Sequence, residues 1–144
     1  MSQPYENENN AERERLLKMT ANLTERDLRR PMPNGWSIAT KLLHLAFWDR
    51  YCLGLLRAWK NTTPALSSLD VDAVNEAVKF LSQAVPPGEA VRLAREAAEA
   101  VDHEVSIIKP ELRSAVETLG RTRLLNRSLH RRAHLDQIED ALKA

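Results

Sequence analysis

Three histidines are the residues of this chain best suited to chemistry. His130 and His134 are four residues apart in a stretch with helical spacing, and His44 lies far upstream in another such stretch. Residues i and i+4 of a helix share a face, with Cβ atoms about 5–6 Å apart, so both imidazoles can point at one place. A third imidazole from a facing helix would complete a three-histidine site for a divalent metal ion with open coordination positions. Such a site would allow chemistry at the ion as well as binding.

Each histidine also has a simpler interpretation. A His-x-x-x-His pair often lies on a solvated helix face, and the neighbouring Arg131 and Arg132 indicate that this helix has one. His44 lies in an almost wholly apolar segment, where one hydrogen bond could satisfy a buried ring. Three buried imidazoles close together would carry several nitrogens that need partners, and a shared ion is an economical solution. His103, in a charged stretch, is expected to be exposed to solvent.

Composition limits the classes of function. The chain has 144 residues, of which 43% are hydrophobic, enough for one domain with a real core. It has 21 basic and 20 acidic residues, and the resulting net charge of +1 gives no overall attraction to nucleic acid or to an anionic membrane. No nucleic-acid-binding motif is recognisable. We therefore expect a small-molecule substrate, with no nucleic acid and no membrane as partner.

Cysteine content and the first residues bear on location. Cys52 is the only cysteine, so no disulfide can form within the chain, and the composition suits a reducing cytoplasm. We expect its side chain to be a small buried apolar group. Residues 1–10 are polar and acidic, unlike a secretory signal, and are expected to form a flexible arm before a single domain over 11–144. No apolar run approaches the roughly 20 residues that span a bilayer.

Helical periodicity dominates the rest of the chain, and strand-like alternation is missing. A short first connection favours antiparallel neighbours, and the long link from the second to the third helix, which holds a short extra helix, allows a parallel pair. The expected fold is therefore all-α, a four-helix bundle in up-down-down-up order. Thr24, Ser37 and Asp70 are candidate helix N-caps, and Gly120 suits the position after a helix end. The expected helices are 11–28 with a kink at Thr24, 36–59, 70–81, 89–108 and 122–142, with a connector of some helical character over 112–120.

Three blocks of the sequence resemble the DinB/YfiT-like superfamily. Residues 34–49, in which Asn-Gly-Trp-Ser leads into Leu-Leu-His-Leu-Ala-Phe-Trp-Asp, are similar to the opening of its metal-bearing helix. Residues 69–75 resemble the segment after that helix, and residues 130–138 resemble its final metal-binding helix. The blocks occur in the family's order, and the similarity covers most of the chain.

This resemblance has consequences for fold and function. It implies a four-helix bundle in up-down-down-up order, often a homodimer. It also implies one divalent ion, zinc or nickel among others, held by His44, His130 and His134. The family includes enzymes that use low-molecular-weight thiols as co-substrates, metal-dependent hydrolases, and members without an assigned reaction. The resemblance therefore favours a metal-dependent thiol S-transferase or hydrolase, in which a water or thiol at the ion would act and no catalytic side chain is assigned.

Other side chains could complete a pocket beside the histidines. Trp48 and Tyr51 lie four and seven residues after His44 and can share its face, either as walls of an apolar pocket or as bundle core. Arg127, three residues before His130, could hold an anionic substrate or could be a solvated arginine paired with an acid.

Two further residues could orient a ligand imidazole through its second nitrogen. Asp49 and Gln137 are both placed for this role, and the sequence does not decide between them. No obvious general base accompanies the histidines. A non-catalytic bundle that binds a metal or a small ligand is therefore the alternative to an enzyme, and a dimerisation module is a third reading.

Overall fold

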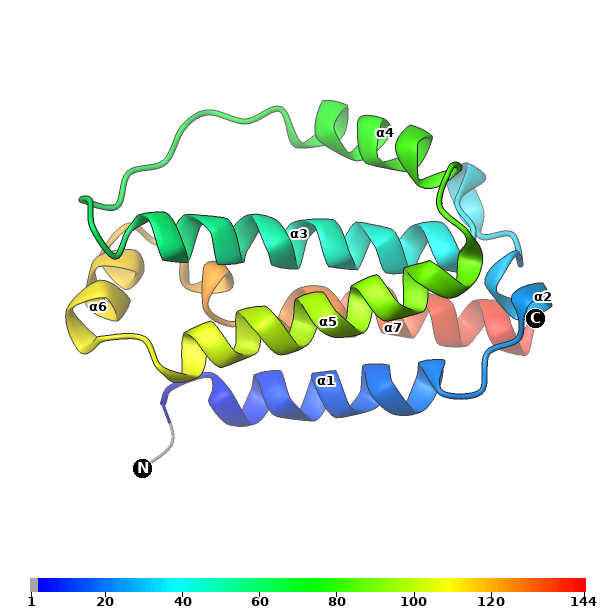
Figure 1. Ribbon diagram of the computed structural model, residues 1–144, viewed down its shortest axis with the longest axis horizontal. Helices are drawn as coiled ribbons and strands as arrows, with labels where there is room; N and C mark the ends of the chain where they lie inside the picture. Colours follow the sequence, from blue (N-terminus) through cyan, green and yellow to red (C-terminus); the bar gives the residue numbers. More distant parts are fainter. Residues whose placement is uncertain (1–2) are drawn as a thin grey trace.

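The computed structural model describes residues 3–144, and within this range it contains seven α-helices and no β-strand. The predicted all-α class is confirmed. Figure 1 shows the long helices lying lengthwise together, with α4 and the loop before it on the outer side of α3. The long helices are α1 (Glu6–Thr20), α3 (Ile38–Ala58), α5 (Pro87–Ser106) and α7 (Ser128–Lys143). The shorter elements are α2 (Glu25–Leu28), η1 (Pro33–Gly35), α4 (Val71–Ser82), α6 (Pro110–Thr118) and η2 (Thr122–Leu124), where η denotes a 3-10 helix.

Local side-chain hydrogen bonds set the helix starts. Thr24 forms a capping box with Asp27, Ser37 accepts the backbone N–H three residues into α3, and Asp70 does the same for α4. All three predicted N-caps are confirmed, and each satisfies an amide that the helix itself leaves unpaired. Gly120 has a φ of 71° just after α6, a left-handed conformation that glycine adopts without steric cost.

α3 is the central helix of the bundle and packs against α5, α7 and α4. Its apolar residues point to several sides, as expected of a helix surrounded by others. Fully burying one leucine contributes about 1.5–3 kcal/mol to folding. The contact between α3 and α5 joins large residues to small ones, among them Ile38, Leu42 and Leu45 on α3 and Ala90, Ala94, Ala97 and Ala98 on α5, all fully buried.

Three boundaries differ from the prediction. The flexible arm expected over 1–10 is wrong for Glu6–Asn10, because α1 begins at Glu6 and Asn9 is buried; Met1 and Ser2 lie outside the described residues. The connector over 112–120, expected to have some helical character, is a full helix through Thr118, and this helix, α6, already begins at Pro110. The last helix begins at Ser128, since the preceding residues form the separate turn η2. Along residues 3–144, no helix combines the length and apolarity that crossing a bilayer requires.

Candidate metal centre

The fold brings three histidines together from two helices. His44 lies on α3, whereas His130 and His134 lie one turn apart near the start of α7. His44 Nε2 is 3.1 Å from His130 Nε2 and also 3.1 Å from His134 Nε2. His44 is buried and the other two are half-buried. The residues that the sequence singled out as ligands therefore face one another in space.

Hydrogen bonding between the rings cannot account for this convergence. A neutral imidazole nitrogen carries either one proton or one lone pair, yet His44 Nε2 has two nitrogen neighbours at the same short distance. When two imidazole nitrogens each bind the same ion at a metal–nitrogen distance of about 2.1 Å, with a nitrogen–metal–nitrogen angle of about 90–110°, the two nitrogens are about 3–3.4 Å apart. The observed separations fall in that interval, so the donor set fits a divalent ion such as zinc.

The second nitrogen of each ring has a different environment. His134 Nδ1 lies 2.8 Å from Gln137 Oε1, to which it donates, and this leaves Nε2 free to bind an ion. His44 Nδ1 is buried and has no partner within the described chain. His130 Nδ1 lies 3.3 Å from Nη2 of Arg127, a group that only donates. Coordination through His130 Nε2 requires a proton on Nδ1, so Arg127 must yield this contact when an ion binds.

Burial keeps the three imidazoles neutral. Loss of solvent, helped by His134 and Lys41, lowers the pKa of His44 to about 3. Loss of solvent, helped by Arg127, lowers the pKa of His130 to about 2, and burial also lowers the pKa of His134. Metal binding requires the unprotonated ring. Each ring is therefore in its binding form at neutral pH without having to release a proton.

A buried network of charges lies behind the histidines. Asp49 accepts hydrogen bonds from Arg127 Nε at 2.9 Å and from Arg131 Nη2 at 3.3 Å. Arg131, which has no exposed surface, also binds both oxygens of Asp102, at 2.7 and 2.8 Å. Arg13 of α1 reaches the same carboxylate at 2.6 Å. The network fixes α7 against α1, α3 and α5.

This network corrects several readings of the sequence. Arg131 is not on a solvated face; only Arg132 is exposed. Asp49 accepts hydrogen bonds from arginines and forms none with the three imidazoles, whereas Gln137 accepts one from the ring of His134. His103 is exposed as predicted, although its two charged neighbours, Asp102 and Glu104, are buried. The sequence does contain a signal for buried charged residues of this kind. A single charged residue among apolar neighbours in a helix is expected to be buried, and a buried charge almost always has a partner of opposite charge.

Comparison with known protein families decides the classification. The family model of the DinB superfamily matches residues 8–143, nearly the whole chain. The chain belongs to the DinB superfamily. No curated protein and no solved structure matches it significantly. The superfamily is metal-binding, which agrees with a histidine triad whose nitrogens converge.

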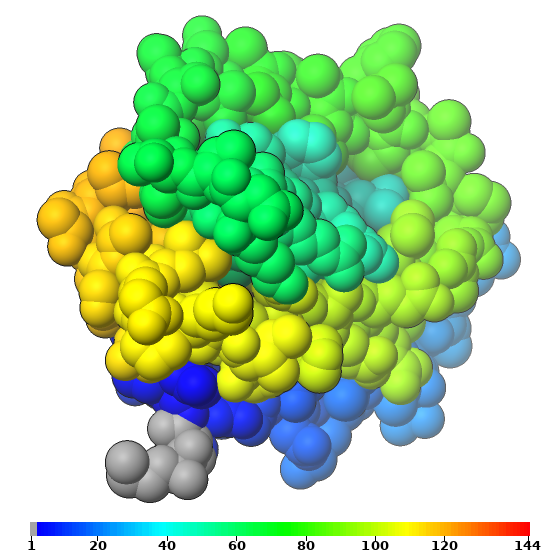
Figure 2. Space-filling view, turned by 60° about the vertical axis from the view of Figure 1, so that its left-hand side comes forward, coloured from blue at the N-terminus to red at the C-terminus, as the bar shows by residue number. Residues whose placement is uncertain are grey.

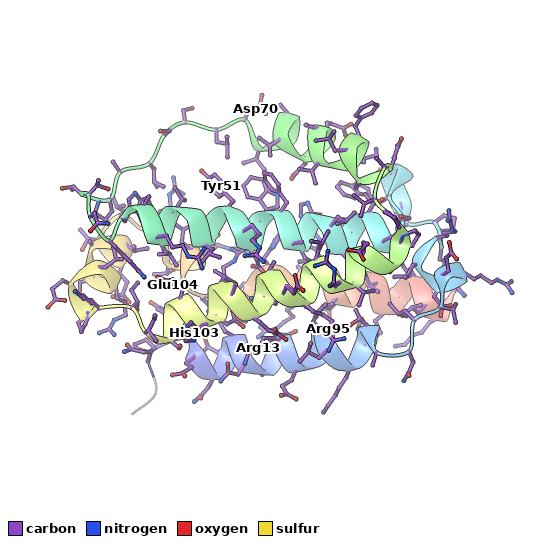
Figure 3. All side chains as sticks on the ribbon, viewed as in Figure 1. Arg13, Tyr51, Asp70, Arg95, His103 and Glu104 are labelled. Carbon is purple, nitrogen blue, oxygen red and sulfur yellow. The ribbon has the colours of Figure 1, made fainter. Side chains whose placement is uncertain are left out.

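In this DinB-superfamily protein the triad opens into a cavity of about 910 Å³. Trp48 and Tyr51, which the sequence left open as pocket wall or core, are half-buried and line this cavity, as does Arg127. Tyr51 projects from α3 toward the loop that leads to α4 (Figure 3). Trp48 Nε1 donates to Asn75 Oδ1 of α4 at 2.8 Å, which ties α4 over the cavity. The ion site would therefore be open to a small molecule.

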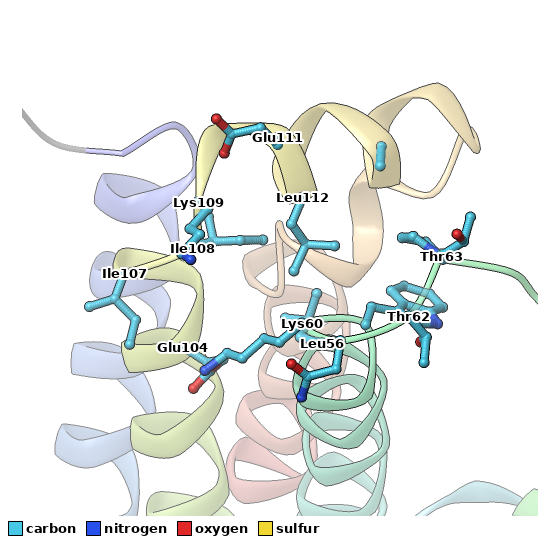
Figure 4. Close-up of a pocket in the computed structure, with 14 residues that line it drawn as sticks. Leu56, Lys60, Thr62, Thr63, Glu104, Ile107, Ile108, Lys109, Glu111 and Leu112 are labelled. Carbon is cyan, nitrogen blue, oxygen red and sulfur yellow. The ribbon is translucent and has the colours of Figure 1, made fainter.

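A second hollow, of about 940 Å³, lies where α3 and α5 end beside α6. Figure 2 shows this end of the molecule, with the loop after α3 next to residues of α5 and α6. Lys60 extends across the hollow to the buried carboxylate of Glu104 (Figure 4). No histidine lines this hollow, and its buried carboxylate, Glu104, is paired with Lys60. The candidate site is therefore the cavity at the triad.

Proposed function

We propose that this protein is a divalent-metal-dependent enzyme that acts on a small molecule by thiol S-transfer or hydrolysis. The observation that carries the proposal is the convergence of His44, His130 and His134 Nε2 atoms at a cavity. A bound ion, with zinc or nickel as the leading candidates, would lower the pKa of a water or a low-molecular-weight thiol and make it nucleophilic near neutral pH. Three protein ligands would leave a coordination position for that group.

The chain's own residues supply positioning and exclusion of water. Gln137 holds His134 in the tautomer that presents Nε2. The rings of Trp48 and Tyr51 provide an apolar wall for the substrate. The bond from Trp48 to Asn75 keeps α4 over the site, which limits access of bulk water. These roles suit either reaction.

A non-catalytic bundle that binds a metal or a small ligand is the second candidate. One observation favours it: no aspartate or glutamate of the described chain lines the cavity. A carboxylate general base beside the triad is therefore missing, and general-base catalysis typically contributes 10²–10⁴-fold to a rate. An enzyme at this site would depend on the ion for activation of the nucleophile.

The proposal extends to the assembly and its setting. The helix directions visible in Figure 1, with α1 and α7 running one way and α3 and α5 the other, support an up-down-down-up bundle. We further propose a homodimer, the common state of soluble oligomers. A single buried free cysteine is compatible with a reducing compartment, and the cytoplasm is the proposed location.

Metal analysis tests the core of the proposal. Protein purified without a histidine tag is expected to hold about one ion per chain after loading with zinc or nickel. His134→Ala is expected to lose the ion, whereas His103→Ala, which changes an exposed histidine on α5, is expected to keep it. Less than about 0.2 ion per chain in the unchanged protein, both as isolated and after loading, contradicts the proposal.

Activity separates the enzyme from the binding-only alternative. Metal-loaded protein is tested against electrophiles with a low-molecular-weight thiol and against ester and amide substrates. The enzyme proposal expects turnover that His134→Ala abolishes while the circular dichroism spectrum stays helical. Stoichiometric metal without turnover across both panels favours the binding-only bundle.

A further inference from the structure

The cavity beside the triad has a positive lining that carboxylates do not balance. Four basic side chains line it, and no acidic side chain of the described chain does. The whole sequence, by contrast, has 21 basic and 20 acidic residues. Arg127 is paired with Asp49, which does not line the cavity. The other three cations, Lys41, Arg121 and Arg123, have no carboxylate partner among residues 3–144. The excess charge is local to this cavity.

Lys41 is the most informative of these cations. Its residue is only 9% exposed, and its ammonium lies 4.3 Å from the centre of the Trp36 ring. Burying a charged group without an opposite charge is costly. The contact with Trp36 offsets part of that cost. Because Lys41 lies one turn before His44 on α3 and lines the same cavity, a charge that neutralises it would lie beside the triad.

Arg121 and Arg123 approach the cavity from another part of the fold. They lie between α6 and α7, at and within η2, and both are exposed. Neither forms an ion pair with any carboxylate of the described residues. Guanidinium groups bind carboxylates, sulfonates and phosphates through paired N–H donors. Cations from two separate elements therefore surround one apolar-walled space.

We propose that the cavity binds a small organic anion, with Lys41 and Arg123 contacting its carboxylate, sulfonate or phosphate group and Trp48 and Tyr51 contacting its apolar part. As a substrate class, this inference rests on the proposed metal-dependent function. The claim that the cavity binds an anion depends only on its basic side chains and its shape, and does not require a bound metal. The two can be tested separately.

The test uses isothermal titration calorimetry on the full chain, in metal-free and in zinc-loaded form, at low ionic strength. The probes are benzenesulfonate and methyl phenyl sulfone, which are similar in shape but differ in charge. The variants are Lys41→Met and Arg123→Gln. Arg95→Gln is the matched control, because Arg95 is an exposed arginine on α5 that does not line the cavity (Figure 3).

We expect benzenesulfonate to bind at least about tenfold more tightly than the sulfone in both forms of the protein. Lys41→Met and Arg123→Gln should each weaken its binding about threefold or more, and Arg95→Gln should leave it within about twofold. Lys41→Arg keeps the charge and should retain binding, which guards against a folding defect in Lys41→Met. Equal binding of the two probes, no measurable binding, or variants that match the control would overturn the proposal.

The metal content of the same samples keeps the two proposals apart. Charge-dependent binding by a protein that takes up no zinc would retain the anion site and reject the metal-dependent function. Stoichiometric zinc without charge-dependent binding would reject the anion site and retain the metal-dependent function. Binding of benzenesulfonate only in the zinc-loaded form, insensitive to Lys41→Met and Arg123→Gln, would assign the anion to the ion and overturn the role of the cations.

Discussion

The side-chain oxygen of Asn9 accepts the backbone N–H of Ser128 at 3.0 Å, so a residue of α1 caps the helix that carries two of the three histidines. The same oxygen accepts the N–H of Arg127 at 2.8 Å, and the amide nitrogen of Asn9 donates to the carbonyl of Leu125 at 2.9 Å. Asn9 is 1% exposed, and the partners of all three side-chain hydrogen bonds lie more than 110 residues away in sequence. The start of α7 is thereby fixed against α1.

Replacement of Asn9 tests this cap. Asn9→Ala leaves two amides and a carbonyl buried without partners, and we expect the free energy of unfolding to fall by about 1–3 kcal/mol. Urea denaturation followed by circular dichroism measures the change. Asn7→Ala, at an exposed position of the same helix, is the control and should stay within about 0.5 kcal/mol. Equal stability of the two variants would show that the cap contributes nothing.

Arg131 and Arg132 form a second matched pair. Arg131→Met leaves Asp49 short of one guanidinium and Asp102 dependent on Arg13 alone, so we expect a loss of about 3–5 kcal/mol. Arg132→Met removes a surface ion pair with Glu12 and should cost less than about 1 kcal/mol. Thermal unfolding of both variants gives the comparison. A small effect at Arg131 would mean that water or rearranged side chains compensate for its loss.

Helices, caps and the metal-ligand candidates could be predicted because their signals are local. Ser37 and Asp70 cap helices through contacts three residues away. His130 and His134 share a face because of their spacing alone, and the apolar context of His44 predicts that it points inward. The common position of the three rings then required only that α3 and α7 pack together.

The charged network could not be predicted from such signals. Periodicity shows which face of a helix is apolar, but it does not show which charged residue will find a partner on another helix. Arg131 lies about 100° around α7 from His130, on a flank that faces α1 and α5. Its partner Asp102 is 29 residues away, and Asn9 is 122 residues away. Tertiary contacts of this kind also stabilise the start of α1, where Asn9 forms hydrogen bonds with residues 125, 127 and 128.

Acid should destabilise the metal-free protein through the triad. Burial lowers the pKa of His44 to about 3 in the folded chain, and the unfolded value is near 6.5. Below pH 6.5 the unfolded chain therefore binds more protons than the folded one, and the free energy of unfolding falls as pH decreases toward 3. The full contribution of the neutral rings is present above pH 6.5.

Urea denaturation at pH 7.5 and 5.5 measures this dependence. We expect the unchanged protein and His103→Gln to lose stability between the two values, and His44→Gln to lose less. The interval lies above the usual range of carboxylate titration, so histidines dominate it. Stability that stays constant or rises on acidification would contradict the assignment of neutral buried rings.

Cys52 should be unreactive although it borders the cavity. The residue is 2% exposed, and burial raises the pKa of its thiol to about 11. The thiolate is the reactive form, so native protein at pH 8 should react with a disulfide reagent at least about 100-fold more slowly than protein in guanidinium chloride. Rapid reaction of the native thiol would show that the cavity wall opens, and would make Cys52 available to a thiol co-substrate.

Gln137 should set the affinity for metal without binding the ion itself. Its Oε1 accepts the proton of His134 Nδ1 at 2.8 Å, which fixes the tautomer and the direction of Nε2. Loss of such a partner typically lowers metal affinity 10–100-fold. We therefore expect Gln137→Ala to weaken zinc binding by about that factor, measured by competition with a chromogenic chelator.

Two variants separate this orienting role from a general effect on α7. Gln137→Glu keeps an acceptor at the same place and should retain or strengthen zinc binding, because a carboxylate makes the coordinating imidazole a better donor. Asp140→Ala removes an exposed side chain one turn further along α7 and should leave affinity unchanged. If Gln137→Ala matches Asp140→Ala, the ring of His134 is held by packing alone. A loss in Gln137→Ala that Gln137→Glu restores would show that the hydrogen bond, and not the helix around it, aims the imidazole at the ion.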